Sequence, residues 1–335
     1  MRRAVLIWLA LAAAAVAALG IALLSGSSRI LPAEIWQGLV DPGQSLAGDV
    51  IGKLRLPRAL AAFAAGGLLA LAGALMQVLL RNPLADPYVL GLSGGAAVGA
   101  LGAMLAGLGA VFVNLGAAAG ALAAIVLVFG LAKRDFARQQ LQAQAAGALD
   151  ASPRLLLTGV ILGSGWSAII ALMLTLGPEA KLRGMLFWLM GDLNGVDNWM
   201  PAMAMLLLGV VLSYATGREL NLMLRGETVA HALGVDVTAL RRRIYLLASL
   251  ATALAVTTGG SIGFIGLVVP HALRLLFGND QRVLLPACAL AGGTLLLLAD
   301  TAARTVVAPM QLPVGVIMAI IGVPSFVFLL MRRRT

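Results

Sequence analysis

Charged residues are scarce in this sequence: they make up 11% of its 335 residues, whereas soluble domains carry about 25%. Hydrophobic residues account for 61%, and 40 positions are glycine, which is commoner in membrane helices than in soluble ones. A soluble core of this length could not use so much apolar surface. The apolar runs are continuous rather than alternating, which excludes a membrane β-barrel and predicts an all-α integral membrane protein.

Histidine and cysteine are almost missing. The single cysteine, Cys288, excludes an internal disulfide, and its apolar surroundings predict a small core residue. His231 and His271 are isolated, with no carboxylate or cysteine at metal-ligand spacing. The sequence therefore predicts no catalytic residues, no metal site and no cofactor bound by this chain.

Lysine and buried acid are rare too, which limits how the chain could drive transport. The three lysines, Lys53, Lys133 and Lys181, are followed by Leu, Arg and Leu, so the phosphate loop of an ATPase is absent. Of 14 acidic residues, only Asp300 lies inside an apolar run, one helical turn before Arg304. Ion-coupled carriers normally hold several ionisable residues at membrane depth. The chain is thus predicted not to be an enzyme by itself, and its energy must come from a partner.

What the sequence does contain is a series of about ten apolar stretches, each long enough to approach the span of a bilayer. The first follows Arg2 and Arg3 and is longer than the apolar region of a secretory signal, so it is predicted to be retained as a helix. The predicted spans are Ala4–Leu24, Ala59–Leu80, Val89–Ala110, Asn114–Leu131, Arg154–Leu176, Trp199–Thr216, Ile244–Thr258, Ile262–Phe277, Val283–Ala302 and Val314–Met331.

The net charge is +10, and the distribution of the basic residues along the chain predicts how these spans are oriented. The basic residues sit in short clusters between apolar runs, which is typical of cytoplasmic membrane loops and not of a nucleic-acid-binding surface. With the N-terminus inside, 17 of the 24 lysine and arginine residues fall on the cytoplasmic side. Because an even number of spans returns the chain to its starting side, both termini are predicted to be cytoplasmic.

Two polar segments stand out from the apolar background. Residues 217–243 form a cytoplasmic loop, in which Glu227–Leu233 is predicted to be a short helix that ends at Gly234. On the outer side, Leu31–Leu39 is predicted to be a short interfacial helix carrying Trp36. The whole chain, residues 1–335, is predicted to be one transmembrane domain that includes the loop 217–243.

Glycines recur at four-residue spacing within several spans, which lets membrane helices approach closely. We expect these glycines to pack helices within one bundle rather than to form a dedicated dimer contact. They are Gly91, Gly95 and Gly99, then Gly116 and Gly120, then Gly159 and Gly163.

A set of short motifs runs through residues 54–330 in a fixed order. They are Leu56-Pro57-Arg58, Gly73-Ala74-Leu75-Met76-Gln77, Asn82-Pro83-Leu84-Ala85-Asp86-Pro87, Gly191, Gly226-Glu227, Leu233-Gly234-Val235, Gly263-Phe264-Ile265-Gly266-Leu267-Val268-Val269-Pro270-His271, Leu298-Ala299-Asp300 and Leu312-Pro313-Val314-Gly315. In these motifs the chain resembles the FecCD-type, BtuC-like permeases, which are the membrane subunits of ABC importers for ferric siderophores, haem or cobalamin.

The resemblance implies a type II ABC importer permease in a bacterial inner membrane. It implies a homodimer, two cytoplasmic ATPase subunits that use ATP and Mg²⁺, and a periplasmic substrate-binding protein. The substrate path would follow the dimer axis, lined by the fifth and tenth spans. The alternative is a secondary or facilitative carrier that works alone, and the substrate stays open.

The resemblance also implies that Arg55, Arg58 and Arg304 hold acidic residues of the binding protein. Arg55 and Arg58 lie on the outer side, against the positive-inside bias, before a helix N-terminus whose dipole repels cations. Spaced by three, they are expected to share one face. The alternatives are that they reach lipid headgroups and that Arg304 simply pairs with Asp300.

On the inner side, the resemblance implies that the short helix couples the permease to its ATPase through Glu227, Thr228, Ala230, Leu233 and Gly234. Apolar side chains of this helix would fit a groove of the ATPase, and the alternative is a solvated loop.

Three further residues carry weaker expectations. Ser152 and Pro153 align with the cytoplasmic gate of the family, but proline departs from the small polar residue expected there and could merely start the fifth helix. His271 follows a proline in a family motif, and a structural role is expected for it rather than a haem-ligating one.

Overall fold

The computed structural model describes residues 2–26, 46–146, 153–196 and 198–331. All regular secondary structure within these ranges is helical. The elements are α1 (Arg2–Leu24), α3 (Leu46–Asp49), η1 (Val50–Arg55), α4 (Leu56–Leu79), η2 (Pro87–Leu90), α5 (Leu92–Leu105), α6 (Ala110–Ala146), α7 (Pro153–Leu176), α8 (Glu179–Leu189), α9 (Met200–Ala215), α10 (Gly217–Met223), α11 (Glu227–Ala232), α12 (Val237–Gly259), α13 (Ile265–Phe277), α14 (Gln281–Thr305) and α15 (Val314–Met331).

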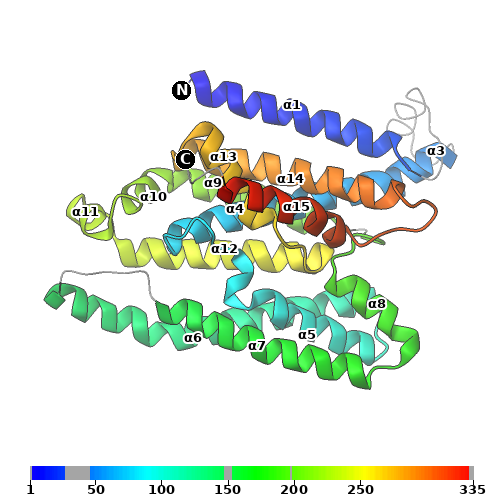
Figure 1. Cartoon of the computed structure of the whole chain (residues 1–335), viewed down its shortest axis with the longest axis horizontal. Helices are drawn as coiled ribbons and strands as arrows, with labels where there is room; N and C mark the ends of the chain where they lie inside the picture. Colours follow the sequence, from blue (N-terminus) through cyan, green and yellow to red (C-terminus); the bar gives the residue numbers. More distant parts are fainter. Residues whose placement is uncertain (1, 27–45, 147–152, 197, 332–335) are drawn as a thin grey trace.

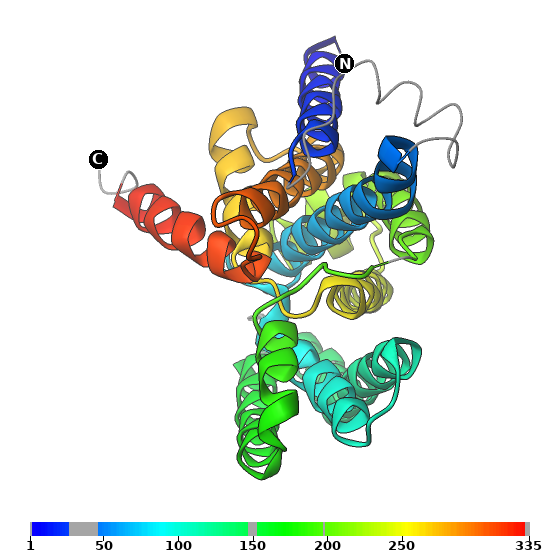
Figure 2. The same ribbon diagram turned by 90° about the vertical axis from the view of Figure 1, so that its right-hand side faces the viewer.

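Helix α4 runs through the middle of the bundle, where it packs against α9, α12, α13 and α14 (Figure 2). Helix α1 lies on the far side of α14, and α5, α6, α7 and α8 form a second group beyond α12 (Figure 1). Helices α3 and α11 lie at opposite ends of the molecule. The start of α1 and the end of α15 both lie on the α11 side.

Small residues explain why α4 can be central. Pro57 occupies its first turn, where a missing N–H costs nothing, and nearly every residue from Ala59 to Leu79 is buried. A Cβ added at Gly73 would collide with the backbone of Gly266 on α13, and one at Gly66 would collide with the backbone of α14. Since only glycine permits such approach, α4 is held tightly by both neighbours.

The predicted glycine stripes pack helices within the chain, as expected. At Gly95, Gly99, Gly116 and Gly120 an added Cβ would collide with backbone atoms of the neighbouring helix, so a larger side chain would not fit. A Cβ added at Gly91 would make only an ordinary contact at 3.4 Å, and one added at Gly163 would meet no atom within 4 Å. The pairs in contact are Gly95 with Gly120, Gly99 with Gly116, and Gly91 with Gly159.

Each of the ten predicted spans overlaps a helix, but the count of ten stays a prediction. Among the described residues, five helices are long and apolar enough to cross a membrane, or six if α9 and α10, bent by 59°, form one span. Three shorter apolar helices, Leu92–Leu105, Ile265–Phe277 and Val314–Leu329, add to these. The chain is therefore an all-helical, multi-pass membrane protein.

Several helices extend beyond the predicted spans. Helix α12 begins at Val237, inside the predicted loop 217–243, because the side chain of Asp236 accepts a hydrogen bond from Ala239 N at 2.9 Å and caps the helix. Helix α6 continues to Ala146, well beyond Leu131. Helix α8 was not predicted at all. The predicted interfacial helix Leu31–Leu39 lies outside the described residues.

Candidate functional site

The end of α4 that the predicted topology places outside, here called its outer end, carries the predicted docking arginines. The helix does not begin there, contrary to expectation: α3 and the π-helical turn η1 precede α4, and together they extend the apolar span back to Ala47. Arg55 is the last residue of η1 and Arg58 lies in the first turn of α4. Neither arginine therefore sits at a free helix N-terminus.

Arg58 binds the one acidic residue predicted at membrane depth. Its Nε donates to both oxygens of Asp300 at 3.0 and 3.1 Å, and its Nη2 donates to Oδ1 at 2.8 Å. The predicted pair of Asp300 with Arg304 is also present, with Arg304 Nε 3.3 Å from Oδ2. Asp300 is fully buried and Arg58 is 8% exposed. A bidentate, desolvated arginine–carboxylate contact of this kind is the strong form of an ion pair.

Arg55 binds different partners from Arg58, although both side chains line the same cavity. Arg55 Nη1 donates to the carbonyls of Leu23 and Leu24 at 2.6 and 3.2 Å, and Arg304 Nη2 donates to that of Ala22 at 3.2 Å. These carbonyls end α1, where the helix dipole is negative. The cations that seemed misplaced are thus compensated inside the chain, by a carboxylate and by a helix C-terminus.

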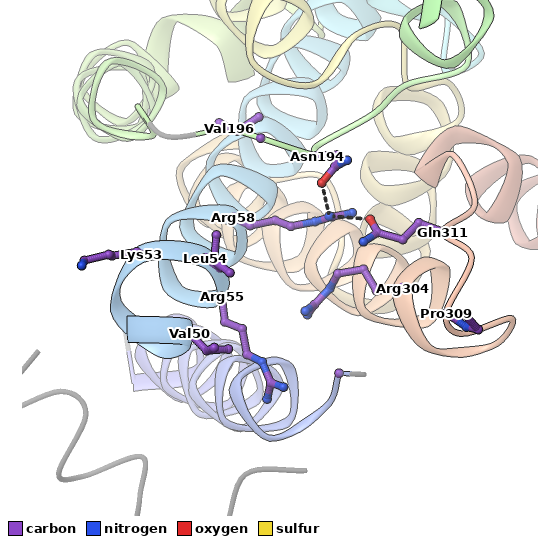
Figure 3. Close-up of a pocket in the computed structure, with 12 residues that line it drawn as sticks. Val50, Lys53, Leu54, Arg55, Arg58, Asn194, Val196, Arg304, Pro309 and Gln311 are labelled. Atoms are coloured by element: carbon purple, nitrogen blue, oxygen red, sulfur yellow. Dashed lines mark hydrogen bonds between the residues drawn. The ribbon is translucent and has the colours of Figure 1, made fainter. Parts of the chain in front are cut away.

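We define the outer cluster as Arg55, Arg58, Arg304 and Asp300, and its three arginines line a cavity of about 200 Å³ (Figure 3). Because the outer cluster contains three guanidinium groups and one carboxylate, its formal charge is +2. Arg58 Nη1 also donates to Gln311 Oε1 at 2.8 Å, which fixes the guanidinium at the cavity wall. The cavity is therefore a positively charged recess at the outer end of α4.

The inner end of α4 carries a second arginine–carboxylate cluster, which the sequence did not predict. Glu227, the first residue of α11, is 4% exposed. Its Oε1 lies 3.3 Å from Arg81 Nη2, just after α4, and accepts a short hydrogen bond from Arg241 of α12. We call Arg81, Glu227 and Arg241 the inner clamp.

The predicted short helix is confirmed as α11, and Gly234 follows it with φ +83°, as a C-terminal cap requires. Of the five predicted coupling residues, Thr228, Leu233 and Gly234 are exposed. Glu227 and Ala230 are buried, so they hold the helix in place and do not offer a contact surface. Val229, which was not selected, is exposed beside Leu233.

Comparisons with known proteins place this chain in a family. The model of the FecCD transport family matches residues 14–332. The chain belongs to the FecCD transport family. It is 42% identical over 284 residues to the vitamin B12 import system permease protein BtuC of Yersinia enterocolitica, covering 84% of this chain and 81% of that protein. It is 40% identical over 288 residues to the cobalamin import system permease protein BtuC of Halobacterium salinarum, covering 85% and 74%.

A solved structure supports the fold of this FecCD protein over almost its whole length. It is an inward-facing conformation of a transporter assigned to the metal-chelate type of ABC transporter, and it superposes with a TM-score of 0.81. The two sequences are 30% identical, and the match covers 97% of this chain and 99% of that one.

A polar clasp that was not predicted ties α10 to the start of α14 in this FecCD protein. Asn221 Nδ2 donates to Asp280 Oδ1 at 2.7 Å, and Gln281 N donates to Asn221 Oδ1 at 2.8 Å. Burial raises the pKa of the Asp280 carboxyl, but hydrogen bonds from Arg282 and Asn221 outweigh it and leave the pKa below its ordinary value. In the sequence, the only signal for this contact was Asn221, which lies a few residues before the predicted helix start at Glu227.

The remaining predicted residues of the FecCD protein have simpler places. Cys288 is buried in α14, as predicted for a core residue, and His271 is buried in α13. His231 lies on the exposed side of α11. Pro153 is the first residue of α7, in agreement with the alternative that it starts the fifth helix, and Ser152 lies outside the described residues.

Proposed function

We propose that this FecCD protein is the permease subunit of an ABC importer and that helix α11 receives the movement of a cytoplasmic ATPase. The observation that carries the proposal is the exposed apolar pair Val229 and Leu233, 42% and 62% exposed, on a helix fixed from behind by the inner clamp. A polar loop helix with a rigid base and an apolar tip suits insertion into a groove of a partner. ATP and Mg²⁺ would be bound by that partner and not by this chain.

The proposed substrate is a metal chelate, and cobalamin is favoured over a ferric siderophore or haem. The support is that the Yersinia and Halobacterium relatives, both at about 40% identity, are cobalamin import permeases. A binding protein on the outer side would present the chelate to the permease.

The proposed assembly is a homodimer of ten-span subunits in the bacterial inner membrane, each subunit a single domain with both termini cytoplasmic. Helices α7 and α15 expose apolar side chains such as Leu172 and Ile320 along much of their length. Both lie toward the same side of the molecule in Figure 2. These two helices are proposed to face the dimer axis and the substrate path. Ser152 and Pro153, at the inner start of α7, are proposed to contribute to the cytoplasmic gate.

Reconstitution tests this function. Proteoliposomes that contain the chain, its ABC ATPase and its binding protein should accumulate labelled cyanocobalamin when ATP is supplied, because the chain has no phosphate loop of its own. Proteoliposomes with the chain alone should accumulate none, with ATP or with an imposed ion gradient. Gradient-driven uptake by the chain alone would favour the stand-alone carrier, and uptake of ferric siderophore in preference to cobalamin would change the substrate.

The outer cluster is proposed to receive an acidic side chain of the binding protein. Arg58 and Arg304 are already paired with Asp300. They would therefore attract an acidic side chain through the net positive charge of the cluster rather than through new hydrogen bonds. Arg55 donates to the carbonyls of Leu23 and Leu24 at the end of α1, and it also lines the cavity. A docked acidic side chain that enters the cavity would therefore meet the guanidinium of Arg55 at its wall.

We expect Arg55→Gln to slow association of the binding protein several-fold at low salt, since rim charges act mainly on association rates. The difference should shrink as ionic strength rises toward physiological values. Glutamine can still donate to the α1 carbonyls, so the fold should be kept.

The matched control for this prediction is Lys181→Gln. Lys181 also lies on the predicted outer side and donates to a helix-terminal carbonyl, that of Leu105, at 2.9 Å. The measurement is binding-protein association with permease–ATPase complexes in nanodiscs across a salt series. Equal rates for Arg55→Gln, Lys181→Gln and wild type at low salt would remove Arg55 from the docking site.

A further inference from the structure

Helix α4 ends in an arginine–carboxylate cluster on each side of the membrane. The outer cluster joins Arg58 of α4 to Asp300 of α14, and the inner clamp joins Arg81, just after α4, to Glu227 of α11. In each case a second arginine contacts the same carboxylate: Arg304, one turn along α14 from Asp300, and Arg241 of α12 for Glu227. The 23 residues from Arg58 to Arg81 span roughly 35 Å at the helical rise, which is enough to cross the bilayer core.

The inner clamp fixes the position of α11. Glu227 and Arg241 are 4% and 7% exposed, so both charges are largely removed from water. Desolvation cancels much of the attraction in a buried ion pair, and such pairs are weak contributors to stability. Such a pair does fix relative position, because a hydrogen-bonded contact determines where two elements meet. Here it sets α11 against the end of α4 and the start of α12.

The backbone at Arg81 also points to a positioned joint. Arg81 has φ +47°, one of two non-glycine residues with positive φ among those described. That conformation is unfavourable for a residue with a Cβ and persists only where surrounding contacts hold it. It ends α4 and at the same time places the guanidinium 3.3 Å from Glu227. The contact and the strain therefore occur at the same residue.

Between the two clusters, α4 behaves as a stiff rod. Its length is buried, and its glycines place its backbone directly against α13 and α14. Close-packed helices shift as units between discrete arrangements and do not deform gradually. A displacement imposed at the outer end of α4 is thus transmitted to Arg81, and through Glu227 to α11.

We propose that Arg81 is a positioning residue that links the coupling helix α11 to α4 through Glu227, so that docking at the outer cluster reaches the ATPase along α4. The proposal rests on the function proposed above, in which α11 contacts the ATPase. Arg241 provides a second, local anchor to α12 that keeps α11 folded when the link to α4 is cut.

The test uses three methionine variants of the complete complex of permease, ATPase and binding protein. Arg81→Met cuts the α4 link and leaves the Glu227–Arg241 pair, so no buried charge is stranded. Arg241→Met cuts the α12 anchor and leaves the link. Arg225→Met removes an exposed arginine of the same segment and is the matched control.

We expect Arg81→Met to keep the ATPase bound and to hydrolyse ATP at the basal rate, while stimulation by the binding protein falls about fivefold or more, the range of allosteric coupling. Arg241→Met and Arg225→Met should keep most of the stimulation. Hydrogen exchange of residues 227–234 should speed up in Arg81→Met and not in Arg225→Met. Arg81→Lys should restore stimulation in part, because it restores the charge.

Normal stimulation of Arg81→Met would overturn the proposal, as would equal losses in Arg81→Met and Arg241→Met, which would indicate a merely local packing effect. Failure of the underlying function is distinguishable. If α11 does not contact the ATPase, a charge placed at Leu233 leaves ATPase association unchanged whatever Arg81 does. If that charge releases the ATPase while Arg81→Met is stimulated normally, only the link along α4 is refuted.

Discussion

Replacing Asp300 by asparagine is expected to destabilise the protein by about 3–5 kcal/mol, the usual cost of removing one partner from a buried ion pair. Asp300 is fully buried and binds both Arg58 and Arg304. Asparagine has nearly the same shape but no charge, so two buried guanidinium groups would lose their shared carboxylate. The unfolding temperature in detergent should drop by roughly 10 °C.

The same helix supplies the control. Asp280 is exposed at the start of α14 and pairs with Arg282 at 3.2 Å, so Asp280→Asn removes a solvent-screened surface pair that contributes little to stability. Removing one arginine as well, in the double variant Asp300→Asn with Arg304→Gln, should recover part of the lost stability. If Asp300→Asn and Asp280→Asn unfold at the same temperature, the outer cluster does not depend on its carboxylate.

The helices of this protein could be predicted because apolar runs report directly on lipid burial. All ten predicted spans overlap helices for that reason. The same criterion fails where a helix is polar: α8 carries Lys181 and Arg183, and the first turns of α12 carry three successive arginines, 241–243. Asp236, which caps α12, could be read from the sequence as a helix start. The apolar run begins only at Ile244, however, so the predicted span begins there.

The candidate site was predictable as a set of positions and not as a set of contacts. Arg58 and Asp300 are 242 residues apart, and nothing in the periodicity of either segment joins them. Glu227 illustrates the same limit. Its place at a helix start suggested an acidic residue that suits the helix dipole, whereas its partners are Arg81, after the distant helix α4, and Arg241 in the next helix α12. Long-range pairing is decided by packing, which a single sequence does not display.

Leu233→Asp is expected to weaken ATPase association at least tenfold. Leu233 is 62% exposed, and Val229 lies one helical turn before it on the same face of the polypeptide, so the two form one apolar tip. An apolar anchor that fills a partner's groove commonly costs 2 kcal/mol or more when it is lost, and a charge in its place adds the cost of desolvation. Because Leu233 is the exposed C-cap of α11 and supports no core contact, the permease itself should fold normally.

The control at the same position is Leu233→Met, which keeps an apolar side chain of similar volume and should keep association within a few-fold. Val229→Ala should fall between the two, since it removes part of the tip without adding charge. Association of the ATPase with permease in nanodiscs is the measurement, and binding-protein association to the same nanodiscs reports that the outer side is intact. Because the substitution is confined to the inner tip, docking should be retained while ATPase binding is lost. Tight ATPase binding by Leu233→Asp would mean that α11 is a solvated loop helix and that the ATPase contacts another inner segment.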